Sequence, residues 1–389
     1  MQTRDGWIFI SANGSGTGRA RVFLDRATRS EPVLVCEGKA AQPVEAMRFA
    51  RKGPHTIQVE AADGAKLEHL SVRAIPELIH CGLGFNPAIK AYGVYDLNFL
   101  KADILPNVTT LVVPSNFRPP EGFADDWHRQ GRTFIAEVGI NGQGKTVEDH
   151  LQHWGRFYDQ APFLDGILIN EFIVNNPASG PGMTLSPERQ QRMELERQRY
   201  VVYAEALMKL RADPRYQNKS VYAYVGGSGK KLNQEVIGTN FIQTLIANGC
   251  RIALERYLHE MSSEKGAAEA LQLFVDGIAD WEAKAPGVKH QMVIAFGLFS
   301  MPPGGLNKLP NVDYHVWMDQ QMNVAANHPA LAGLGGLEWW TTSQTDEETV
   351  RFVGRLYRHY AIEGKTNRLT RDPVFLTHLQ NTDFEKGTA

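Results

Sequence analysis

The chain has 389 residues, of which 43% are hydrophobic and 22% charged, and its formal net charge is −2. This composition is typical of a globular protein and excludes a disordered chain. The balanced charge, with no long basic run, argues against nucleic acid or an anionic membrane as the main partner. No stretch of about 18 apolar residues appears, so we expect no segment that spans a bilayer.

The N-terminal residues MQTRDGWIFI lack the charged, apolar and small-residue regions of a signal peptide. The chain fits a secreted or periplasmic protein whose signal peptide has been removed, and a cytoplasmic protein is the alternative. Cys36, Cys81 and Cys250 have no metal-like spacing and are expected to be buried thiols, which do not distinguish these compartments.

Residues 1–75 contain short runs that alternate between polar and apolar positions, as half-buried strands do. The runs are GWIFIS, RARVFLD, EPVLVCEG, HTIQVEA and LEHLSVRA, and turn-rich segments separate them. We predict a small all-β sandwich, an accessory domain, over this part of the chain. Its glycine cluster NGSGTGRA (13–20) lies between two strands and is expected to form a hairpin loop. We expect Trp7 and Phe9 to pack the core of this domain or its face against the barrel, with sugar contact as the alternative.

Residues 76–363 alternate apolar strand-like runs with helical segments. Eight such units occur, and their runs are continuously apolar, as strands covered by helices require. The runs are LIHCGLG, VTTLVVP, RTFIAEVG, DGILINEF, SVYAYVG, CRIALERY, HQMVIAFG and LGGLEWW. The count and the length predict a (β/α)8 TIM barrel, an α/β fold, as the catalytic domain.

Residues 364–389 have no partner in this scheme and form a C-terminal tail. The segment NTDFEKG near its end resembles the opening of many carbohydrate-binding β-sandwich modules. This resemblance implies the start of a further module that is truncated here, and a frayed tail is the alternative.

Carboxylates stand at the ends of four of the eight predicted barrel strands: Glu137, Glu171, Glu255 and Glu338. A single buried carboxylate is costly unless it is paired, so one such residue could be structural. Active sites of TIM barrels lie at the C-terminal ends of the strands, where all four side chains would converge. The set therefore predicts a catalytic mouth.

Convergent carboxylates with aromatic neighbours suit glycoside hydrolysis, in which one carboxylic acid protonates the leaving oxygen and a second group attacks or activates water. Aromatic rings stack against the apolar faces of sugars. Adjacent residues of a strand point to opposite sides, so only one of Trp339 and Trp340 can face the mouth. We predict a carbohydrate substrate and no cofactor or metal, with these substrate-binding candidates: His80, Asn86, Glu137, Asn170, Tyr224, Trp339 and Trp340.

The sequence INEF at the end of the fourth run resembles the Asn-Glu pair of clan A (β/α)8 glycoside hydrolases. The resemblance implies that Glu171 is the acid/base and that Asn170 contacts the sugar 2-hydroxyl. That clan keeps its nucleophile at the end of strand seven, but the seventh run here, MVIAFG, holds no acid. The partner of Glu171 must then be Glu255 or Glu338, and we favour Glu255.

Two other functions stay open. Residues 139–146, GINGQGKT, fit the P-loop pattern, in which Lys145 would pair with phosphates and Thr146 would hold magnesium. We discount this nucleotide-binding alternative because the motif lies in the third of eight units and no later run clearly ends in the required Asp. The second alternative is a barrel that binds glycans without cleaving them.

Overall fold

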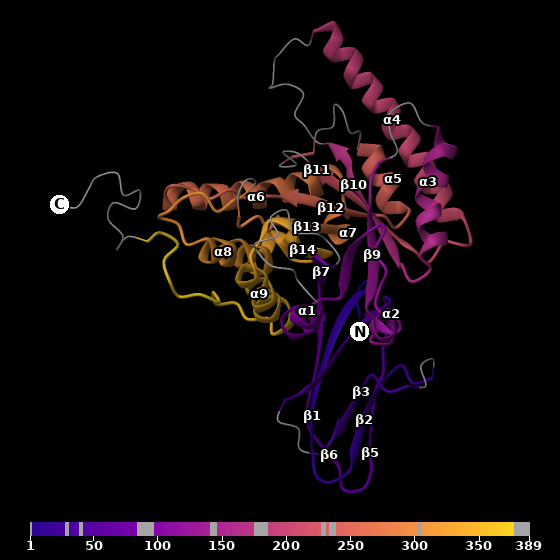
Figure 1. Cartoon of the computed structure of the whole chain (residues 1–389), viewed down its shortest axis with the longest axis vertical. Helices are drawn as coiled ribbons and strands as arrows, with labels where there is room; N and C mark the ends of the chain where they lie inside the picture. Colours follow the sequence, from indigo (N-terminus) through magenta and orange to yellow (C-terminus); the bar gives the residue numbers. More distant parts are fainter. Residues whose placement is uncertain are drawn as a thin grey trace, which may run out of the picture. The chain divides into compact units, whose positions relative to one another are not determined.

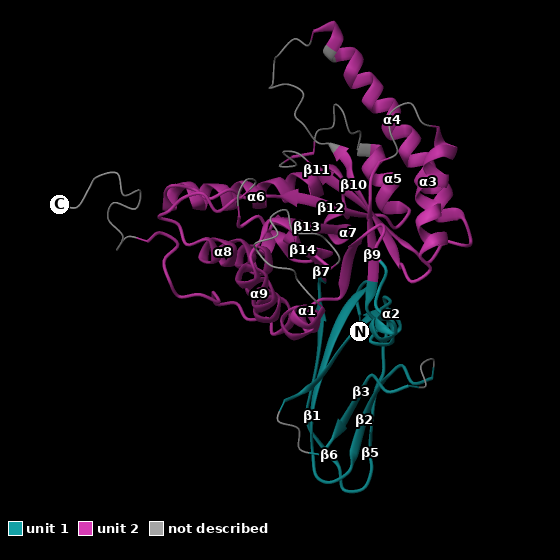
Figure 2. Cartoon of the chain, in the orientation of Figure 1, with its two compact units in different colours: residues 1–77, 118–133 teal, residues 78–117, 134–389 magenta. Residues whose placement is uncertain are grey.

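The computed structural model describes residues 2–27, 31–38, 42–83, 97–140, 146–174, 186–226, 231–232, 239–301 and 305–376. The chain divides into two compact units (Figure 2). The first unit combines Met1–Glu77 with Arg118–Thr133, and the second combines Leu78–Phe117 with Phe134–Ala389. Figure 1 labels the helices and strands of both units.

The first unit is built from two antiparallel three-stranded sheets, ordered β4-β1-β6 and β3-β2-β5. Along β1 and β2 alternate residues, such as Ile10 and Val22, enter a shared apolar core, because successive side chains of a strand point to opposite faces. The helix α2 also belongs to this unit. The elements are β1 (Gly6–Ser15), β2 (Arg19–Leu24), β3 (Leu34–Glu37), β4 (Val44–Ala50), β5 (Ile57–Ala61), β6 (Lys66–Ile75) and α2 (Phe123–Arg129).

Trp7 and Phe9 are buried in this unit, with exposed fractions of 2% and 6%. Trp7 packs edge-on against Phe49, with ring centroids 5.8 Å apart. Both side chains therefore act as packing residues and present almost no surface to a ligand.

The second unit contains a closed barrel of eight strands in the order β10-β11-β12-β13-β14-β7-β8-β9. Every pairing given for these strands is parallel, for example β12 with β13 and β13 with β14. The predicted TIM barrel is thus confirmed. The strands are β7 (Glu77–Cys81), β8 (Thr110–Pro114), β9 (Thr133–Val138), β10 (Gly166–Val174), β11 (Ser220–Gly226), β12 (Arg251–Arg256), β13 (Met292–Gly297) and β14 (Gly336–Trp340).

Helices follow the strands and surround the barrel (Figure 1). Thr146 and Asp149 form a capping box at the start of α3, and Asp346 caps α9 by accepting the Thr349 amide. No helix among the described residues is both long and apolar enough to cross a membrane. The helices are α1 (Leu97–Asp103), α3 (Val147–Gln160), α4 (Pro187–Ala212), α5 (Thr239–Ala247), α6 (Glu264–Lys284), α7 (Val288–Gln291), α8 (Tyr314–Asn327), α9 (Glu347–Leu356) and the π-helical turn η5 (Tyr357–Ile362).

The side chains at every second position of each strand point into the barrel and fill its interior. These interior residues form one apolar cluster: Ile79, Cys81, Val112, Ile135, Leu168, Tyr222, Tyr224, Ala253, Val293, Ala295 and Trp340. This cluster identifies the inward face of each strand. Residues two positions from a cluster member along a strand also face inward, and residues next to a cluster member face outward.

Candidate active site

The C-terminal end of β10 is irregular where it carries Asn170 and Glu171. Ile169 pairs with Ala223 of β11, but Ile173 pairs with Val225, so β10 holds extra residues between the two pairs. Such a bulge bends a strand and redirects its side chains, and bulges are frequent beside active sites. Glu171 has a φ of 48°, a left-handed conformation that is rare for residues other than Gly, Asn and Asp.

This bulge explains why an apolar strand ends on an amide and a carboxylate. The run from Gly166 to Ile169 is buried as a barrel wall requires, whereas Glu171 is exposed. The chain therefore leaves the regular strand at Asn170, and Glu171 reaches solvent instead of the packed interior. Backbone conformations of this kind cost energy and persist where the surrounding structure enforces them, typically at functional sites.

Glu171 and Glu255 converge on Gly226 at the end of β11. A Cβ atom placed on Gly226 would lie 3.5 Å from Oε2 of Glu255 and 3.7 Å from Cγ of Glu171. The two carboxyl side chains therefore approach one point from β10 and β12, on either side of β11. Gly226 is buried and adds no side chain of its own between them.

Glu137 and Asn170 form a second polar pair at this end of the barrel. The Asn170 Nδ2 group donates to Oε1 of Glu137 at 2.9 Å. Burial raises the pKa of Glu137, and the hydrogen bond from Asn170 partly opposes that rise. Because a carboxylate accepts hydrogen bonds and does not donate them, this contact turns the NH2 group of Asn170 toward Glu137 and leaves its amide oxygen to other partners.

Glu338 lies within the barrel, in the layer of Ala295 and Glu255. Ala295 pairs with both of these residues across the β12, β13 and β14 strands. Glu338 is completely buried, with an exposed fraction of 0%, whereas Glu255 is half-buried. Of the two candidate partners for Glu171, only Glu255 thus combines access with contact at Gly226.

Two buried tyrosines lie within electrostatic range of these carboxylates. The Tyr224 and Tyr257 hydroxyl oxygens lie 2.5 Å apart in a hydrogen bond. Burial raises the pKa of both hydroxyls well above the ordinary value, and the negative charges of Glu255 and Glu338 raise it further. Both tyrosines thus stay neutral hydrogen-bonding groups at the base of the mouth.

The two neighbouring tryptophans of β14 face opposite ways. Trp340 belongs to the interior cluster and lies 4.9 Å from the Tyr224 ring, between centroids. Trp339 is in register with Phe296, and their rings pack 5.0 Å apart behind the barrel wall. Of the two, Trp340 is the one placed to meet a ligand.

His80 also lies apart from the interior face. It stands between Ile79 and Cys81, which both point inward, and its exposed fraction is 1%. Burial lowers the pKa of His80 to about 4, so the imidazole is neutral at physiological pH. The His80 side chain therefore lies on the outer face of the barrel wall, away from a substrate in the barrel mouth. Asn86, the other candidate near this strand, lies outside the described residues.

The P-loop-like segment gains no support from the part of it that the structure describes. Lys145 lies outside the described residues. The Thr146 hydroxyl exchanges hydrogen bonds with Asp149 as the cap of α3. Among the described residues, no cluster of His, Cys, Asp and Glu side chains is arranged to hold a metal ion.

Sequence reasoning did not single out Gly226 and Tyr257. Tyr257 follows Glu255 by two positions and therefore shares its face of the strand, a signal that was present in the sequence. Gly226 is important because it places no side chain between Glu171 and Glu255, and no pattern in the sequence identifies such a position.

No protein-family model matches the chain, and no curated protein sequence does so either. Solved structures with a similar fold include a xylanase from Cellvibrio japonicus in complex with xylopentaose, at 10% identity and a TM-score of 0.41, covering 95% of this chain and 85% of that one.

A thermostable mutant of another xylanase from Cellvibrio japonicus is 12% identical with a TM-score of 0.43, and the match covers 73% of this chain and 97% of that one. A chitinase from Rhizomucor miehei is 10% identical with a TM-score of 0.40, and the match covers 72% and 99% of the two chains. These proteins are glycoside hydrolases by name, and at such identities the likeness concerns the fold alone.

Proposed function

We propose that the barrel is a glycoside hydrolase that cleaves a poly- or oligosaccharide with a pair of carboxylates. Glu171 is the acid/base, and Glu255 is its partner. The convergence of these two side chains at Gly226 is the observation that carries the proposal. Their origin on strands that flank β11 gives each a separate approach to a bond held between them.

We take the reaction to be retaining, with carboxyl groups about 5 Å apart, and keep an inverting reaction at about 6.5–9.5 Å as the alternative; the contacts at Gly226 are compatible with either. Glu171 and Glu255 both contact the position of a single Cβ atom, within 3.7 Å and 3.5 Å.

In the first step, Glu171 donates its proton to the glycosidic oxygen while the Glu255 carboxylate attacks the anomeric carbon. The bond to the leaving oxygen breaks, and an ester joins the sugar to Glu255. In the second step, Glu171 accepts a proton from water as the water oxygen attacks the same carbon and displaces Glu255. Both carboxyl groups return to their initial states.

The remaining residues bind and orient the sugar. Trp340 packs on the fully buried Tyr224 ring and presents the small accessible part of its indole to the sugar. The amide oxygen of Asn170 accepts from a sugar hydroxyl while Glu137 holds the amide in place. Glu338 is fully buried in the layer of Glu255, and its charge acts on the mouth from inside the barrel. Glu338 is the alternative partner of Glu171.

The assignment is tested with Glu171→Gln, Glu255→Gln and Glu338→Gln on aryl glycosides whose leaving groups differ in acidity. Loss of the general acid should cost at least about 100-fold with a poor leaving group and much less with an acidic phenol. Loss of the nucleophile should abolish turnover of both. An inactive Glu338→Gln beside an active Glu255→Gln would reassign the pair.

A barrel that binds glycans without cleaving them remains the second candidate. The half-buried Asn170 amide and the accessible part of Trp340 would serve binding equally well. In that case the wild type would bind a glycan without product formation, and Glu171→Gln would leave its affinity within about twofold of the wild-type value, since no proton transfer is involved.

A further inference from the structure

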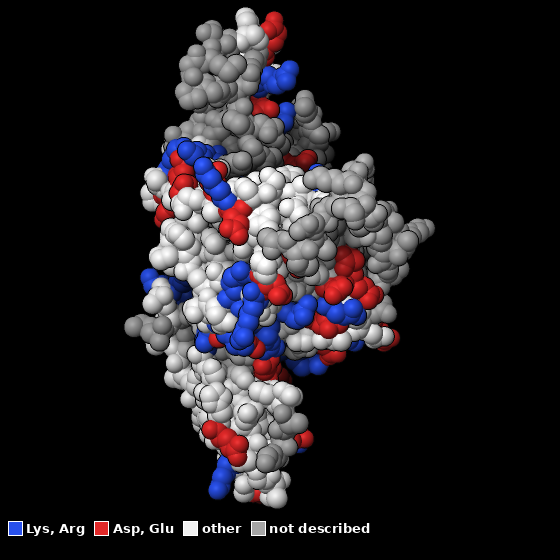
Figure 3. Space-filling model, turned by 90° about the vertical axis from the view of Figure 1, so that its left-hand side faces the viewer, with Lys and Arg blue, Asp and Glu red and all other residues white. Residues whose placement is uncertain are grey.

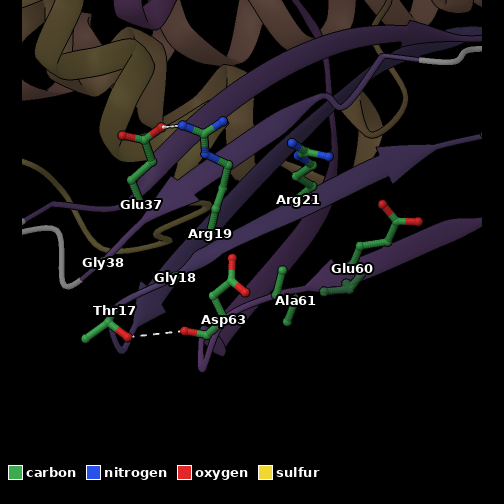
Figure 4. A pocket seen from close by; sticks show the side chains of 11 residues that line it. Thr17, Gly18, Arg19, Arg21, Glu37, Gly38, Glu60, Ala61 and Asp63 are labelled. Atoms are coloured by element: carbon green, nitrogen blue, oxygen red, sulfur yellow. Dashed lines mark hydrogen bonds and ion pairs between the residues drawn. The ribbon is translucent and has the colours of Figure 1, made fainter.

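The first unit carries a hollow of about 950 Å³ on the sheet β3-β2-β5. Known ligand sites span roughly 300–1,000 Å³, so the hollow is large enough for several sugar rings. Its lining comes from β2, from the neighbouring strands β3 and β5 with their ends, and from the β1–β2 and β5–β6 turns (Figure 4). Each of these turns joins strands of different sheets, so residues 13–20 do not form the expected hairpin loop. One of these turns is the glycine cluster 13–20, which the barrel chemistry does not involve.

The rim of the hollow is formed by backbone in close contact. A Cβ atom at Gly18 would overlap the carbonyl oxygen of Ala62, so only glycine lets the β1–β2 turn approach the β5–β6 turn this closely. The Thr17 hydroxyl donates to the carbonyl oxygen of Asp63 at 3.2 Å and ties the two turns together. A rim held in this way is formed before any ligand arrives, which lowers the entropic cost of binding.

Arginine and carboxylate side chains line the hollow, on the face of the sheet β3-β2-β5 that points away from the core. Arg19 and Arg21 stand two positions apart on β2 and therefore project from the same face, opposite to the core residues Ala20 and Val22. Arg19 forms an ion pair with Glu37 across to β3 at 2.5 Å (Figure 4).

Glu60, on β5, is in register with Arg21 but forms its ion pair with Arg26. Within the part of the chain that the structure describes, Arg21 has no ion pair, and neither has the Asp63 carboxylate. A guanidinium group and a carboxylate thus face the same hollow with their hydrogen-bonding capacity free.

The charges of the lining select the kind of ligand. Two arginines stand against three carboxylates: Arg19, Arg21, Glu37, Glu60 and Asp63. Glu37 pairs with Arg19, and Glu60 pairs with Arg26. The unpaired charges among the described lining residues are therefore Arg21 and Asp63, which are of opposite sign and give no net attraction for a polyanion. No aromatic ring lines the hollow within the described residues, so binding there relies on hydrogen bonds instead of stacking.

We infer that this hollow binds a neutral, hydroxyl-rich glycan chain, at a site separate from the barrel mouth. Arg21 donates to sugar hydroxyl oxygens, and the Asp63 carboxylate accepts from hydroxyl groups on the same chain. Trp7 and Phe9, the aromatic candidates of this unit, are buried and take no part. The inference stands without the proposed hydrolase activity, because binding requires none of the barrel residues.

The test is affinity electrophoresis of the full chain in gels that contain arabinoxylan, galactomannan or hydroxyethyl cellulose as neutral glycans, with polygalacturonate as the anionic comparison. All variants carry Glu171→Gln, so that hydrolysis does not consume the gel. Arg21→Ala removes the free donor, and Asp63→Asn removes the charge while keeping a residue that tolerates the left-handed φ of 55°. Arg73→Ala, an exposed arginine of β6 in the other sheet, is the matched control.

We expect at least one neutral glycan to retard the parent chain, with an affinity that falls tenfold or more in Arg21→Ala and in Asp63→Asn but not in Arg73→Ala. Retardation that survives both hollow substitutions would overturn the inference, as would no retardation by any neutral glycan or stronger binding of polygalacturonate. Turnover of a small aryl glycoside by Arg21→Ala without the Glu171 change reports on the barrel separately. Inactivity there would count against the hydrolase and leave the binding result intact.

Discussion

Gly226→Ala should change activity and stability in opposite directions, so it tests the proposed geometry of the active site apart from the stability of the barrel. The added methyl group would meet Oε2 of Glu255 at 3.5 Å and Cγ of Glu171 at 3.7 Å, which are ordinary van der Waals contacts. The φ of Gly226 lies outside the left-handed region, so alanine fits the backbone. Replacing glycine at such a position stabilises a protein by about 0.4–1 kcal/mol through the unfolded chain.

The same methyl group would occupy the space where the proposal puts the reacting carbon. A displacement of about 1 Å in an active site can cost about 100-fold in rate, so we expect kcat/KM to fall by at least that factor. Thermal unfolding and aryl glycoside hydrolysis, measured on one preparation, report the two effects. Activity within about threefold of wild type would refute the proposed position of the bond between Glu171 and Glu255.

Three further predictions concern other parts of the chain. Both tryptophans are buried, so Trp340→Ala and Trp339→Ala should each lower the free energy of unfolding by about 3–5 kcal/mol. Trp340→Ala, on the inner face, should in addition raise KM about tenfold; equal effects of the two variants on KM would contradict their opposite orientation. The hydrogen bond to Asp25 raises the pKa of His55. The stabilisation of the fold by the protonated imidazole is therefore fully present below about pH 6.5 and is lost as the pH rises through the pKa of the folded state. The urea midpoint of the wild type, relative to that of His55→Asn, should fall from pH 6 to pH 8; an unchanged difference would disprove this coupling of protonation to folding. Asp319 accepts hydrogen bonds from the Tyr360 hydroxyl and from backbone amides of the segment 366–376. Asp319→Ala should therefore lower the free energy of unfolding by about 3 kcal/mol and speed proteolysis of that segment. If the variant resists trypsin as well as the wild type does, Asp319 does not hold the segment in place.

The architecture was predictable from the sequence because each barrel strand is a continuous apolar run between helical segments. A strand covered on one face by helices and on the other by the barrel core must be apolar throughout, and Gly166–Ile169 and Met292–Gly297 both follow this rule. The grouping of Arg118–Thr133 with the first unit was not predictable, because the segment reads as an ordinary strand-to-strand connection of the barrel.

The sequence supplies the members of the candidate site, and their relative geometry comes only from the structure. Alternation along β14 shows that only one of its tryptophans faces inward, but register with Phe296 was needed to establish which one. The orientation of Glu171 depends on a bulge and a left-handed φ, which local composition does not encode. The difference in exposure between Glu255 and Glu338 likewise arises from packing between distant strands.

The central claim is that the barrel hydrolyses glycosidic bonds and that Glu171 supplies the proton. Its most direct test is a hydrolysis screen of wild type and Glu171→Gln against a panel of poly- and oligosaccharides, with products separated by chromatography. We predict that the wild type releases sugars from at least one glycan and that the variant is at least about 100-fold slower on it. Undiminished release by Glu171→Gln, or no product from any glycan with a folded wild-type protein, would contradict the account.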